Sequence, residues 1–382
     1  MPFRALGLGP AILHAVQDAG YTEPTPVQLK AIPVILKGHD AIGIAQTGTG
    51  KTAAFVLPIL ERLAAHPAPK STRVLVLVPT RELAAQVEEN VRKYARHVPV
   101  RCAPVFGGVN ESPQIKALQS HVDIVVATPG RLLDLMGRFG NPFKQLEVLV
   151  LDEADRMLDM GFLPDMRRIL KQLPTRRQTL LFSATLSKEI EDVAREFLTR
   201  PEVIQVGRRS APTHTVTQLV YEVPKSRKVP LLLHLLKDEG LDCVLVFSRT
   251  KRGADKLAKR LAAENISTSA LHSNRSQSQR QASLRGFKSG QYRVLVATDI
   301  AARGIDVDGI SHVVNFDFPA APEDYVHRIG RTGRAQAIGD ALSFVTSEDH
   351  EALRDLERFI GRGIPRRTVE GLKDDQPPAR PA

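Results

Sequence analysis

The sequence predicts an α/β fold in which parallel strands alternate with helices. Short runs rich in β-branched residues recur along the chain, and most are continuous, which is typical of strands buried on both faces of a parallel sheet. Stretches with helical periodicity lie between these runs, and this alternation favours an α/β architecture. The runs cover residues 74–78, 124–127, 148–151, 180–182, 244–247, 294–297 and 313–316.

The composition is that of a globular protein with a basic balance. A length of 382 residues suggests two or three domains at ~150 residues each. With 42% hydrophobic and 25% charged residues, the chain can bury real cores, which argues against a disordered or collagen-like chain or a disulfide scaffold. No apolar run approaches the ~18 residues of a membrane helix, and the N-terminus lacks a signal layout, so we expect a cytoplasmic protein without membrane contact. The net charge of +11 suggests a polyanionic partner, nucleic acid before membrane.

The chain divides into two similar halves. A break is indicated around residues 206–212, and helical periodicity ends after Ile364, where a Pro-rich stretch follows. We therefore expect a first domain over residues 1–206, a linker over 207–215, a second domain over 216–365 and a flexible tail over 366–382. In the first domain, Thr25-Pro26 is typical of a helix N-cap and first residue, and Gly38 of the end of that helix.

Nearly every predicted strand ends in a polar cluster. Open parallel sheets bind ligands at the carboxyl ends of their strands, so these clusters stand where chemistry is expected. They cover residues 79–82, 128–131, 152–155, 183–185, 248–250 and 298–299.

A phosphate-binding loop lies between a predicted strand over residues 40–45 and a helical stretch. Its sequence is Gln46-Thr47-Gly48-Thr49-Gly50-Lys51-Thr52. The glycines allow backbone N–H groups to approach phosphates, Lys51 would reach the β- and γ-phosphates, and the Thr52 hydroxyl would ligate Mg²⁺. The alternative is a Gly/Thr turn with a solvated lysine. One departure from the generic loop is Ala45, which replaces its first glycine.

Asp152 and Glu153 supply the second half of such a site, because they follow the strand over residues 148–151. In this arrangement one carboxylate holds the metal, through water, and its neighbour activates the attacking water. We assign Asp152 to Mg²⁺ and Glu153 to the general base. The alternative is a solvated acidic turn that caps a helix.

An arginine-rich loop, residues 327–334, lies in the second half, which has no phosphate loop of its own. Such a loop is useful if it reaches the γ-phosphate held by the first half, because arginines strongly stabilise the negative charge of a phosphoryl group in the transition state. A solvated basic turn or a contact to RNA phosphates alone are the alternatives.

Taken in order, these segments resemble the motifs of the DEAD-box RNA helicases of helicase superfamily 2, from Phe3 to about Pro365. Within that resemblance, the sequence of residues 328–334 and 364–366 is most similar to that of the bacterial RhlE-like subgroup. The matching segments are the Q motif (20–28, with Phe3 upstream), I (45–52, in which the family itself has Ala45), Ia (79–83), GG (Gly107-Gly108), Ib (128–131), II (152–155), III (183–185), IV (246–250), QxxR (Gln277, Arg280), V (299–306) and VI (327–334).

The resemblance implies two tandem RecA-like domains, each a mostly parallel sheet flanked by helices, with ATP between them and RNA across both. It implies an RNA-stimulated ATPase that locally unwinds or remodels RNA duplexes and RNA–protein complexes by closing the two domains on single-stranded RNA. The cofactors would be ATP and Mg²⁺. RNA would be held through its backbone with little sequence specificity. We expect a monomer, and no ribosomal or RNA-decay partner can be named from the sequence.

The resemblance also assigns roles to single residues. Tyr21 would stack on adenine, and Gln28 would pair with the adenine N6 donor and N7 acceptor, the complementarity that glutamine shows for adenine in DNA. Phe3, Thr47, Gly48, Thr49, Gly50, Lys51, Thr52 and Asp306 complete the nucleotide set, and Lys51, Glu153, Arg331 and Arg334 the catalytic set. Coupling between the ATP site and closure falls to Asp155, Ser183, Thr185, Arg303 and His327. The RNA-binding set is Arg81, Gly107, Gly108, Thr128, Arg131, Arg280 and Thr298.

Rival functions stay open at this level. A non-catalytic RNA clamp would show defects at Lys51, Glu153 or Arg334, and none is present. A DNA translocase of the same superfamily would be stimulated by DNA and usually lacks Tyr21 and Gln28 in this arrangement. A protein that anneals RNA through charge alone would need no ATP. The segment His272-Ser273-Asn274 departs from the family's common His-Gly-Asp, which leaves that loop's shape open.

Overall fold

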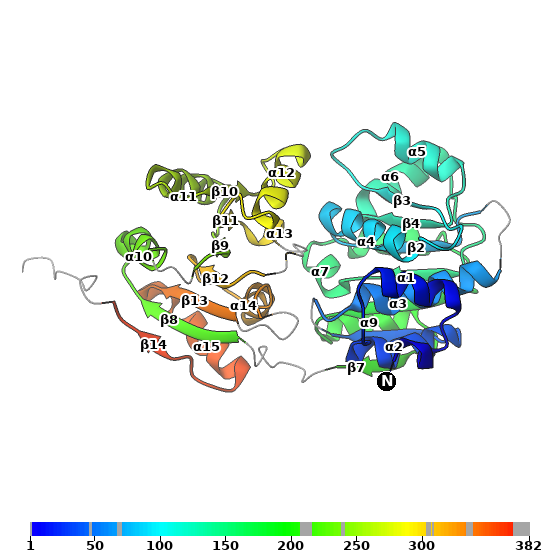
Figure 1. The fold of residues 1–382 in the computed structure, drawn as a ribbon, viewed down its shortest axis with the longest axis horizontal. Helices are drawn as coiled ribbons and strands as arrows, with labels where there is room; N and C mark the ends of the chain where they lie inside the picture. Colours follow the sequence, from blue (N-terminus) through cyan, green and yellow to red (C-terminus); the bar gives the residue numbers. More distant parts are fainter. Residues whose placement is uncertain are drawn as a thin grey trace, which may run out of the picture. The chain divides into compact units, whose positions relative to one another are not determined.

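In the computed structural model, the protein forms two compact units, Met1–Arg209 and Ser210–Ala382. Each unit holds a seven-stranded sheet, and every strand pairing in the described residues is parallel. Helices cover both faces of each sheet (Figure 1). This confirms the predicted α/β fold. The structure describes residues 2–45, 48–66, 71–206, 216–237, 241–302, 307, 309–333 and 339–369.

The first unit contains a sheet with the strand order β3-β4-β2-β5-β6-β1-β7. The central strands are short, fully buried and rich in Val, Leu and Ile, as expected for a sheet covered on both faces. The strands are β1 (Ala41–Ile44), β2 (Val74–Leu77), β3 (Cys102–Val105), β4 (Ile124–Ala127), β5 (Val148–Leu151), β6 (Gln178–Ser183) and β7 (Glu202–Gln205).

Alternate side chains of this sheet pack into two cores. One core joins the sheet to the 3₁₀ helix η1 (Phe3–Leu6) and to α1 (Pro10–Asp18), α2 (Pro26–Leu36), α3 (Lys51–Ala65) and α4 (Arg81–Tyr94). The other joins it to α5 (Ser112–Gln119), α6 (Pro129–Phe139), α7 (Ala154–Asp159), α8 (Leu163–Leu170) and α9 (Lys188–Phe197). Helix α2 begins after Thr25 and is followed by Gly38 with φ 81°, as the sequence predicts.

The second unit repeats the topology of the first. Its strand order is β10-β11-β9-β12-β13-β8-β14. Each strand therefore occupies the place that the strand numbered seven lower has in the first sheet. The strands are β8 (Val216–Glu222), β9 (Val244–Phe247), β10 (Thr268–Leu271), β11 (Val294–Ala297), β12 (His312–Asn315), β13 (Gly339–Val345) and β14 (Arg366–Arg367). One core includes α10 (Lys228–Leu235) and α11 (Lys251–Ala263). Other cores include α12 (Gln277–Lys288), α13 (Asp299–Ala302), α14 (Pro322–Ile329) and α15 (His350–Ile360). Short 3₁₀ helices, η2 (Lys225–Arg227) and η3 (Ser347–Asp349), complete the unit.

The C-terminal boundary lies later than the sequence indicates. We expected a flexible tail from residue 366, whereas Arg366 and Arg367 form β14, which pairs with β8. The Val220 N–H also donates to the Pro365 carbonyl at 2.9 Å. The backbone of β8 would otherwise present an unpaired edge, and the two arginines pair with it at Val220 and Tyr221.

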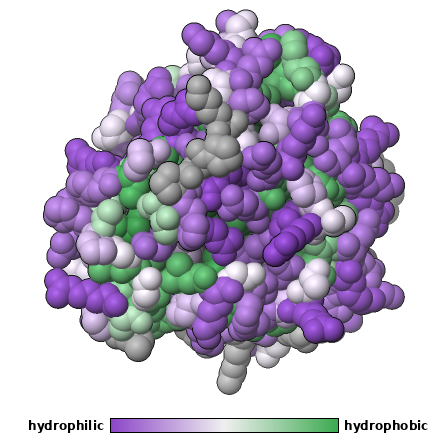
Figure 2. Space-filling view, turned by 90° about the vertical axis from the view of Figure 1, so that its right-hand side faces the viewer, coloured by the Kyte–Doolittle hydropathy of each residue, from purple (hydrophilic) through white to green (hydrophobic). Residues whose placement is uncertain are grey.

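The surface agrees with the composition. The side of the molecule shown in Figure 2 is dominated by hydrophilic side chains, with hydrophobic ones in smaller groups between them. Among the described residues, no helix combines the length and the apolar character needed to cross a bilayer.

Candidate functional site

The sequence-predicted residues of the first unit gather at one edge of its sheet, where the strands end. The phosphate loop follows β1, Ser183 ends β6 and Asp152 follows β5, and these three strands are neighbours. Arg81 follows β2, Gly107 follows β3 and Thr128 follows β4, which are neighbours in the other half of the sheet. The sheet therefore separates the nucleotide candidates from the RNA candidates along a single edge.

The phosphate loop places Lys51 at the first position of α3. Gly48 and Gly50 have φ of 82° and 90°, conformations that favour glycine. The buried Lys51 ammonium donates to the Ala45 carbonyl at 2.9 Å, across the loop. Thr52 follows on the same helix turn, while Thr47 lies outside the described residues. A lysine held over a glycine-rich turn at a helix N-terminus is suited to phosphate.

Gln28 connects the Q motif to this loop. Its amide oxygen accepts from the Thr25 backbone N–H at 2.9 Å, and its amide nitrogen donates to the Gly50 carbonyl at 3.1 Å. A Cβ at Gly50 would lie 2.5 Å from the Gln28 amide nitrogen, so a larger residue there would displace this amide, and the φ of 90° favours glycine as well.

The two aromatic candidates differ in exposure. Phe3 is only 5% exposed within the core and presents little surface to a ligand. Tyr21 is half-buried, its hydroxyl lies 2.8 Å from that of Tyr94, and the Lys93 ammonium lies 5.4 Å from its ring centre. Of the two, Tyr21 has the ring surface that stacking requires.

Asp152 and Glu153 are both buried at the end of β5. Burial raises the pKa of Asp152 to about 7, although the positive charge of Lys51 opposes the rise. Glu153 has φ 51° and ψ 52° directly before α7, and its carboxylate forms an ion pair with Arg156 at 2.8 Å. Asp152 is thus a carboxylate for which a cation would relieve the cost of ionisation.

Asp155 joins the acidic segment to the segment after β6. Its carboxylate accepts from the backbone N–H groups of Ala184 and Thr185 at 3.0 and 3.1 Å, and from the Thr185 hydroxyl at 3.3 Å. The Thr185 N–H also lies 3.3 Å from the buried Ser183 hydroxyl. The structure therefore brings together the first-unit residues that we expected to act in coupling.

The RNA candidates of the first unit form a basic cluster. The Arg81 guanidinium packs so closely on Gly108 that any side chain there would overlap it, and Gly108 has φ 79°. Arg131 approaches Gly107 from α6, with a guanidinium nitrogen 3.9 Å from the position of a Cβ. The Arg131 Nη1 is buried and has no hydrogen-bond partner among the described residues. Two guanidinium groups beside the N-termini of α4 and α6 make a site suited to phosphate.

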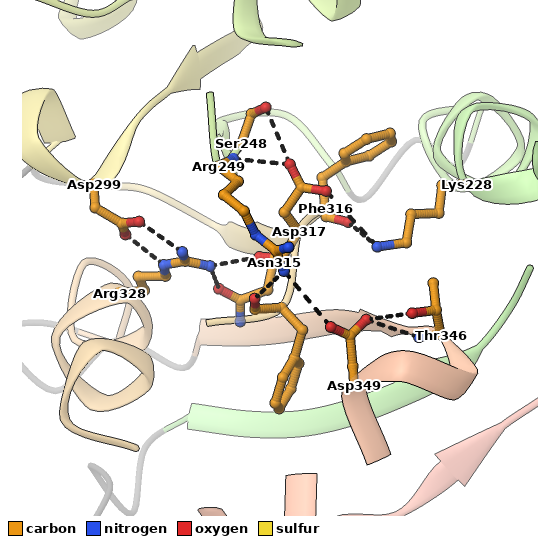
Figure 3. A network of polar contacts seen from close by, with 11 residues as sticks. Lys228, Ser248, Arg249, Asp299, Asn315, Phe316, Asp317, Arg328, Thr346 and Asp349 are labelled. Carbon is orange, nitrogen blue, oxygen red and sulfur yellow. Dashed lines mark hydrogen bonds and ion pairs between the residues drawn. The ribbon is translucent and has the colours of Figure 1, made fainter. Parts of the chain in front are cut away.

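In the second unit, a polar network lies at the carboxyl ends of the strands (Figure 3). Arg328, in the last turn of α14, binds both carboxylate oxygens of Asp299 at 2.6 and 2.8 Å. Beside it, Asp317 accepts from the Ser248 hydroxyl at 3.2 Å and from the Arg249 backbone N–H at 2.8 Å. The ends of β9, β11 and β12 are thereby connected through side chains.

The structure describes some of the remaining second-unit candidates. Arg331 is buried, and its Nε donates to the His327 carbonyl at 3.2 Å. Thr298 is buried at the end of β11, and Arg280 is half-buried on α12. Arg303, Asp306 and Arg334 lie outside the described residues.

Sequence reasoning missed partners that lie across turns or elements. Arg156 stands three residues after Glu153, a spacing at which helix side chains meet, and that spacing was the available signal. Arg328 stands inside the arginine-rich loop but received no role. No sequence signal links Arg328 to Asp299, because their contact depends on the tertiary fold.

The fold and this site define a class of protein. The first unit has a phosphate loop after β1 and an acidic pair after β5. The second unit repeats its topology but carries arginines where the first has the phosphate loop. Together these features describe a tandem RecA-like nucleotide-dependent enzyme. Family profiles agree: "DEAD/DEAH box helicase" matches residues 25–193, and "Helicase conserved C-terminal domain" matches residues 227–336.

Similar proteins extend the match to nearly the whole chain. The DEAD-box ATP-dependent RNA helicase CshA of Bacillus cereus is 44% identical over 97% of this chain and 70% of its own length. The ATP-dependent RNA helicase RhlB of Pseudomonas syringae is 43% identical over 95% of this chain and 93% of its own. Among solved structures, S. cerevisiae Dbp5 bound to RNA and ADP BeF3 has a TM-score of 0.89 at 30% identity, covering 97% of this chain and 96% of its own. Mss116p bound to ssRNA and AMP-PNP has a TM-score of 0.87 at 28% identity, covering 96% and 78%.

The chain belongs to the DEAD-box ATP-dependent RNA helicases. It is an RNA helicase and ATPase, and its partner is RNA.

Proposed function

We propose that this chain hydrolyses Mg²⁺-bound ATP in a cycle that its residues couple to RNA binding. One observation carries the proposal: the phosphate loop with its acidic pair and the Arg81–Arg131 cluster end neighbouring strands of one sheet. A change at one group of strand ends can therefore reach the other through a rigid sheet.

The nucleotide would be held mainly by the first unit. Backbone N–H groups of the loop and Lys51 would bind its phosphates, and Tyr21 would stack on adenine. The Gln28 amide already makes one bond through its oxygen and one through its nitrogen. An amide oxygen accepts two hydrogen bonds and an amide nitrogen donates two, so one of each remains for the adenine edge.

Mg²⁺ fits the residues that the sequence assigns to it. Thr52 and Asp152 offer hydroxyl and carboxylate oxygens, the ligands that this cation prefers. The raised pKa of Asp152 reflects a buried carboxylate without enough positive charge around it, and a divalent ion would supply that charge. When bound, Mg²⁺ neutralises charge on the phosphates.

Glu153 would take the proton from the attacking water. The ion pair with Arg156, at 2.8 Å, limits the directions in which its carboxylate can turn. Arg331 and Arg334 of the second unit would stabilise charge on the γ-phosphate. In the structure, the Arg331 Nε donates to the His327 carbonyl at 3.2 Å.

RNA would bind through its phosphates and sugars at Arg81, Gly107-Gly108, Thr128 and Arg131, with Arg280 and Thr298 contributing from the second unit. Such contacts carry no base information, so sequence specificity should be low. Contacts to 2′-hydroxyls would favour RNA over DNA.

The cycle would be a population shift. ATP and RNA would each bind the closed two-domain state better than the open one, so each favours binding of the other. Closure would complete the catalytic site and separate the bound strand locally from its partner, and hydrolysis would reopen the domains.

The test is ATP turnover at low salt without nucleic acid, with single-stranded RNA and with matched single-stranded DNA. Strong stimulation by RNA alone supports the proposal. Equal stimulation by DNA would indicate a translocase, and RNA binding without turnover would indicate a clamp that does not cycle.

Subgroup, location and assembly are finer proposals. We expect RhlE-like character from residues 328–334 and 364–366, and the relatives named CshA and RhlB offer two competing assignments. Because the activity consumes ATP and acts on RNA, we propose a cytoplasmic location. A monomer is proposed as well, and sedimentation at micromolar concentration would test it.

A further inference from the structure

Arg328 donates hydrogen bonds to several groups inside the second unit. Its Nε and Nη2 donate to the two Asp299 oxygens, and its Nη1 donates to the Asn315 side-chain oxygen at 3.1 Å and to the Asp317 carbonyl at 2.7 Å. The guanidinium carries five N–H donors, so these bonds use four of them. Its centre also lies 4.9 Å from the ring centre of Phe247. With 5% of its surface exposed, Arg328 is not placed to contact RNA or ATP itself.

The acceptors of Arg328 come from separate elements. Asp299 begins α13 directly after β11, and Asn315 ends β12. Asn315 is fully buried and donates its own amide to the Ser343 hydroxyl in β13 at 3.0 Å, which fixes the orientation of that amide. Arg328 therefore ties α14 to the ends of β11 and β12, as Figure 3 shows.

The neighbours of the two charged residues belong to different ligands in the proposed function. Thr298, adjacent to Asp299, is a proposed RNA contact, and Arg331, one turn beyond Arg328, is a proposed γ-phosphate contact. A small pocket is lined by Asp299, His327, Arg328 and Arg331 together with Phe247 and Asp324, so these residues share one location.

We propose that the Arg328–Asp299 ion pair is the positioning element that couples RNA binding to ATP binding within the second unit. A bidentate arginine–carboxylate pair has a fixed geometry, so the end of β11 and the end of α14 move as one body while it is intact. Without it, each ligand can be accommodated by its own segment, and the binding of one no longer favours the binding of the other. This inference rests on the proposed function.

The experiment uses two conservative variants of the full chain. Arg328→Lys keeps the charge but loses the two-point geometry, and Asp299→Asn keeps the shape and one acceptor. The control is Arg366→Lys, which weakens another arginine–carboxylate pair of the same unit, with Glu357. The affinity of a short labelled single-stranded RNA is measured with and without AMP-PNP, and thermal unfolding shows that each variant is folded.

We expect the wild type and Arg366→Lys to bind RNA more tightly with AMP-PNP, by a factor within the usual range of about 5–150. In Arg328→Lys and Asp299→Asn this factor should fall toward one, while RNA affinity without nucleotide and nucleotide affinity without RNA each change by less than about threefold. The double variant should be no worse than either single variant, because both remove the same interaction.

An unchanged coupling factor in both folded variants would overturn the inference. So would a collapse of RNA or nucleotide affinity alone with the coupling factor preserved, because that pattern indicates a direct ligand contact. Asp299→Asn is isosteric and keeps the experiment decisive if Arg328→Lys does not fold. Failure of the proposed function would show separately, as wild-type turnover that RNA does not stimulate.

Discussion

Glu153 combines features that are costly in an ordinary carboxylate. Its backbone lies in the left-handed region at φ 51°, and its side chain is buried beside Asp152 and Asp155, which are also acidic. Strained conformations of this kind persist where the surroundings hold them and are concentrated at functional sites. The Arg156 ion pair is the compensation visible in the structure.

Glu153→Gln should separate binding from chemistry. The amide keeps the shape of the side chain but cannot accept the proton, so kcat should fall by about 10²–10⁴-fold, the usual range for a general base. RNA and ATP affinities should stay close to wild type. Steady-state turnover with saturating RNA measures the effect, with Glu111→Gln, an exposed carboxylate paired with Arg138, as control. Near-normal turnover would remove Glu153 as the base.

Asp152 should make the metal-free protein less stable as the pH rises. Its pKa is about 7 in the folded chain against an ordinary 3.8, so between these values the folded state binds more protons than the unfolded state. Stability must then fall with rising pH, by about 4 kcal/mol at most, since one pKa unit corresponds to about 1.36 kcal/mol.

The comparison of wild type with Asp152→Asn in EDTA isolates this effect. The variant should gain stability relative to wild type between about pH 4 and pH 7 and hold that gain above pH 7. Denaturant unfolding at several pH values measures it. A stability difference independent of pH would show that the carboxylate ionises as it does in water.

At the residue scale, functional residues within contiguous segments were predictable, and contacts between residues distant in the sequence were not. Lys51, Asp152 and Glu153 stand in short motifs whose chemistry is local, and the structure places them after β1 and β5, which flank β6 in the sheet. The ion pair between Arg328 and Asp299 joins residues 29 positions apart, and nothing in either local sequence indicates the other.

At the scale of elements, the sequence predicted most of the strands inside the two sheets and missed the edge strands together with β8 and β13. The continuous runs correspond to β2, β4, β5, β6, β9, β11 and β12, which are inside their sheets, and β1 was expected from the phosphate loop. The edge strands β3, β7, β10 and β14 are partly exposed, so they lack a continuous hydrophobic run. In β8, buried and exposed positions largely alternate, and β13 begins with Gly-Asp, which weakened both signals.

The edge strand β3 is protected by its own neighbours. The carbonyls of Arg101 and Val105 accept hydrogen bonds from backbone N–H groups of Ile124 and Thr128, on the side of β4. The backbone groups of residues 102, 104 and 106 therefore face outward. Pro104 has no N–H, and the Phe106 N–H and carbonyl are both bonded by the buried Gln114 amide, each at 3.1 Å. The open edge thus offers few groups to another strand.

Gln114→Ala should destabilise the first unit by about 1–3 kcal/mol, because two backbone groups of Phe106 lose their partners. The Phe106 amide should also exchange its hydrogen faster. Thermal unfolding and hydrogen exchange measure these changes, and Gln119→Ala, an exposed glutamine of the same helix, is the control. Equal stability of both variants would show that water replaces the glutamine without cost.

At the scale of the whole molecule, the repeated topology explains where the RNA candidates stand. Thr128 follows β4 and Thr298 follows β11, which occupy the same position in the two sheets. Asp317, in the network of Figure 3, comes shortly after β12, the counterpart of the strand that Asp152 follows. At the end of β12 the second unit therefore has internal hydrogen bonds, whereas at the end of the corresponding strand β5 the first unit has its acidic pair.

If RNA is held by its phosphates, the affinity must depend on salt in a countable way. Each phosphate contact to a single strand releases counterions, so losing one contact should reduce the slope of log affinity against log salt by about 0.7. Arg131→Ala should therefore weaken RNA binding equally for all sequences and flatten the salt dependence by about that amount. Arg92→Ala, which removes an exposed arginine paired with Glu88 on α4, should leave the slope unchanged. Titrations of single-stranded RNA from low to moderate salt measure both. A loss of affinity at Arg131 with no change in slope would mean that this guanidinium acts through the Gly107-Gly108 turn and not on a phosphate, since only a direct ionic contact releases counterions.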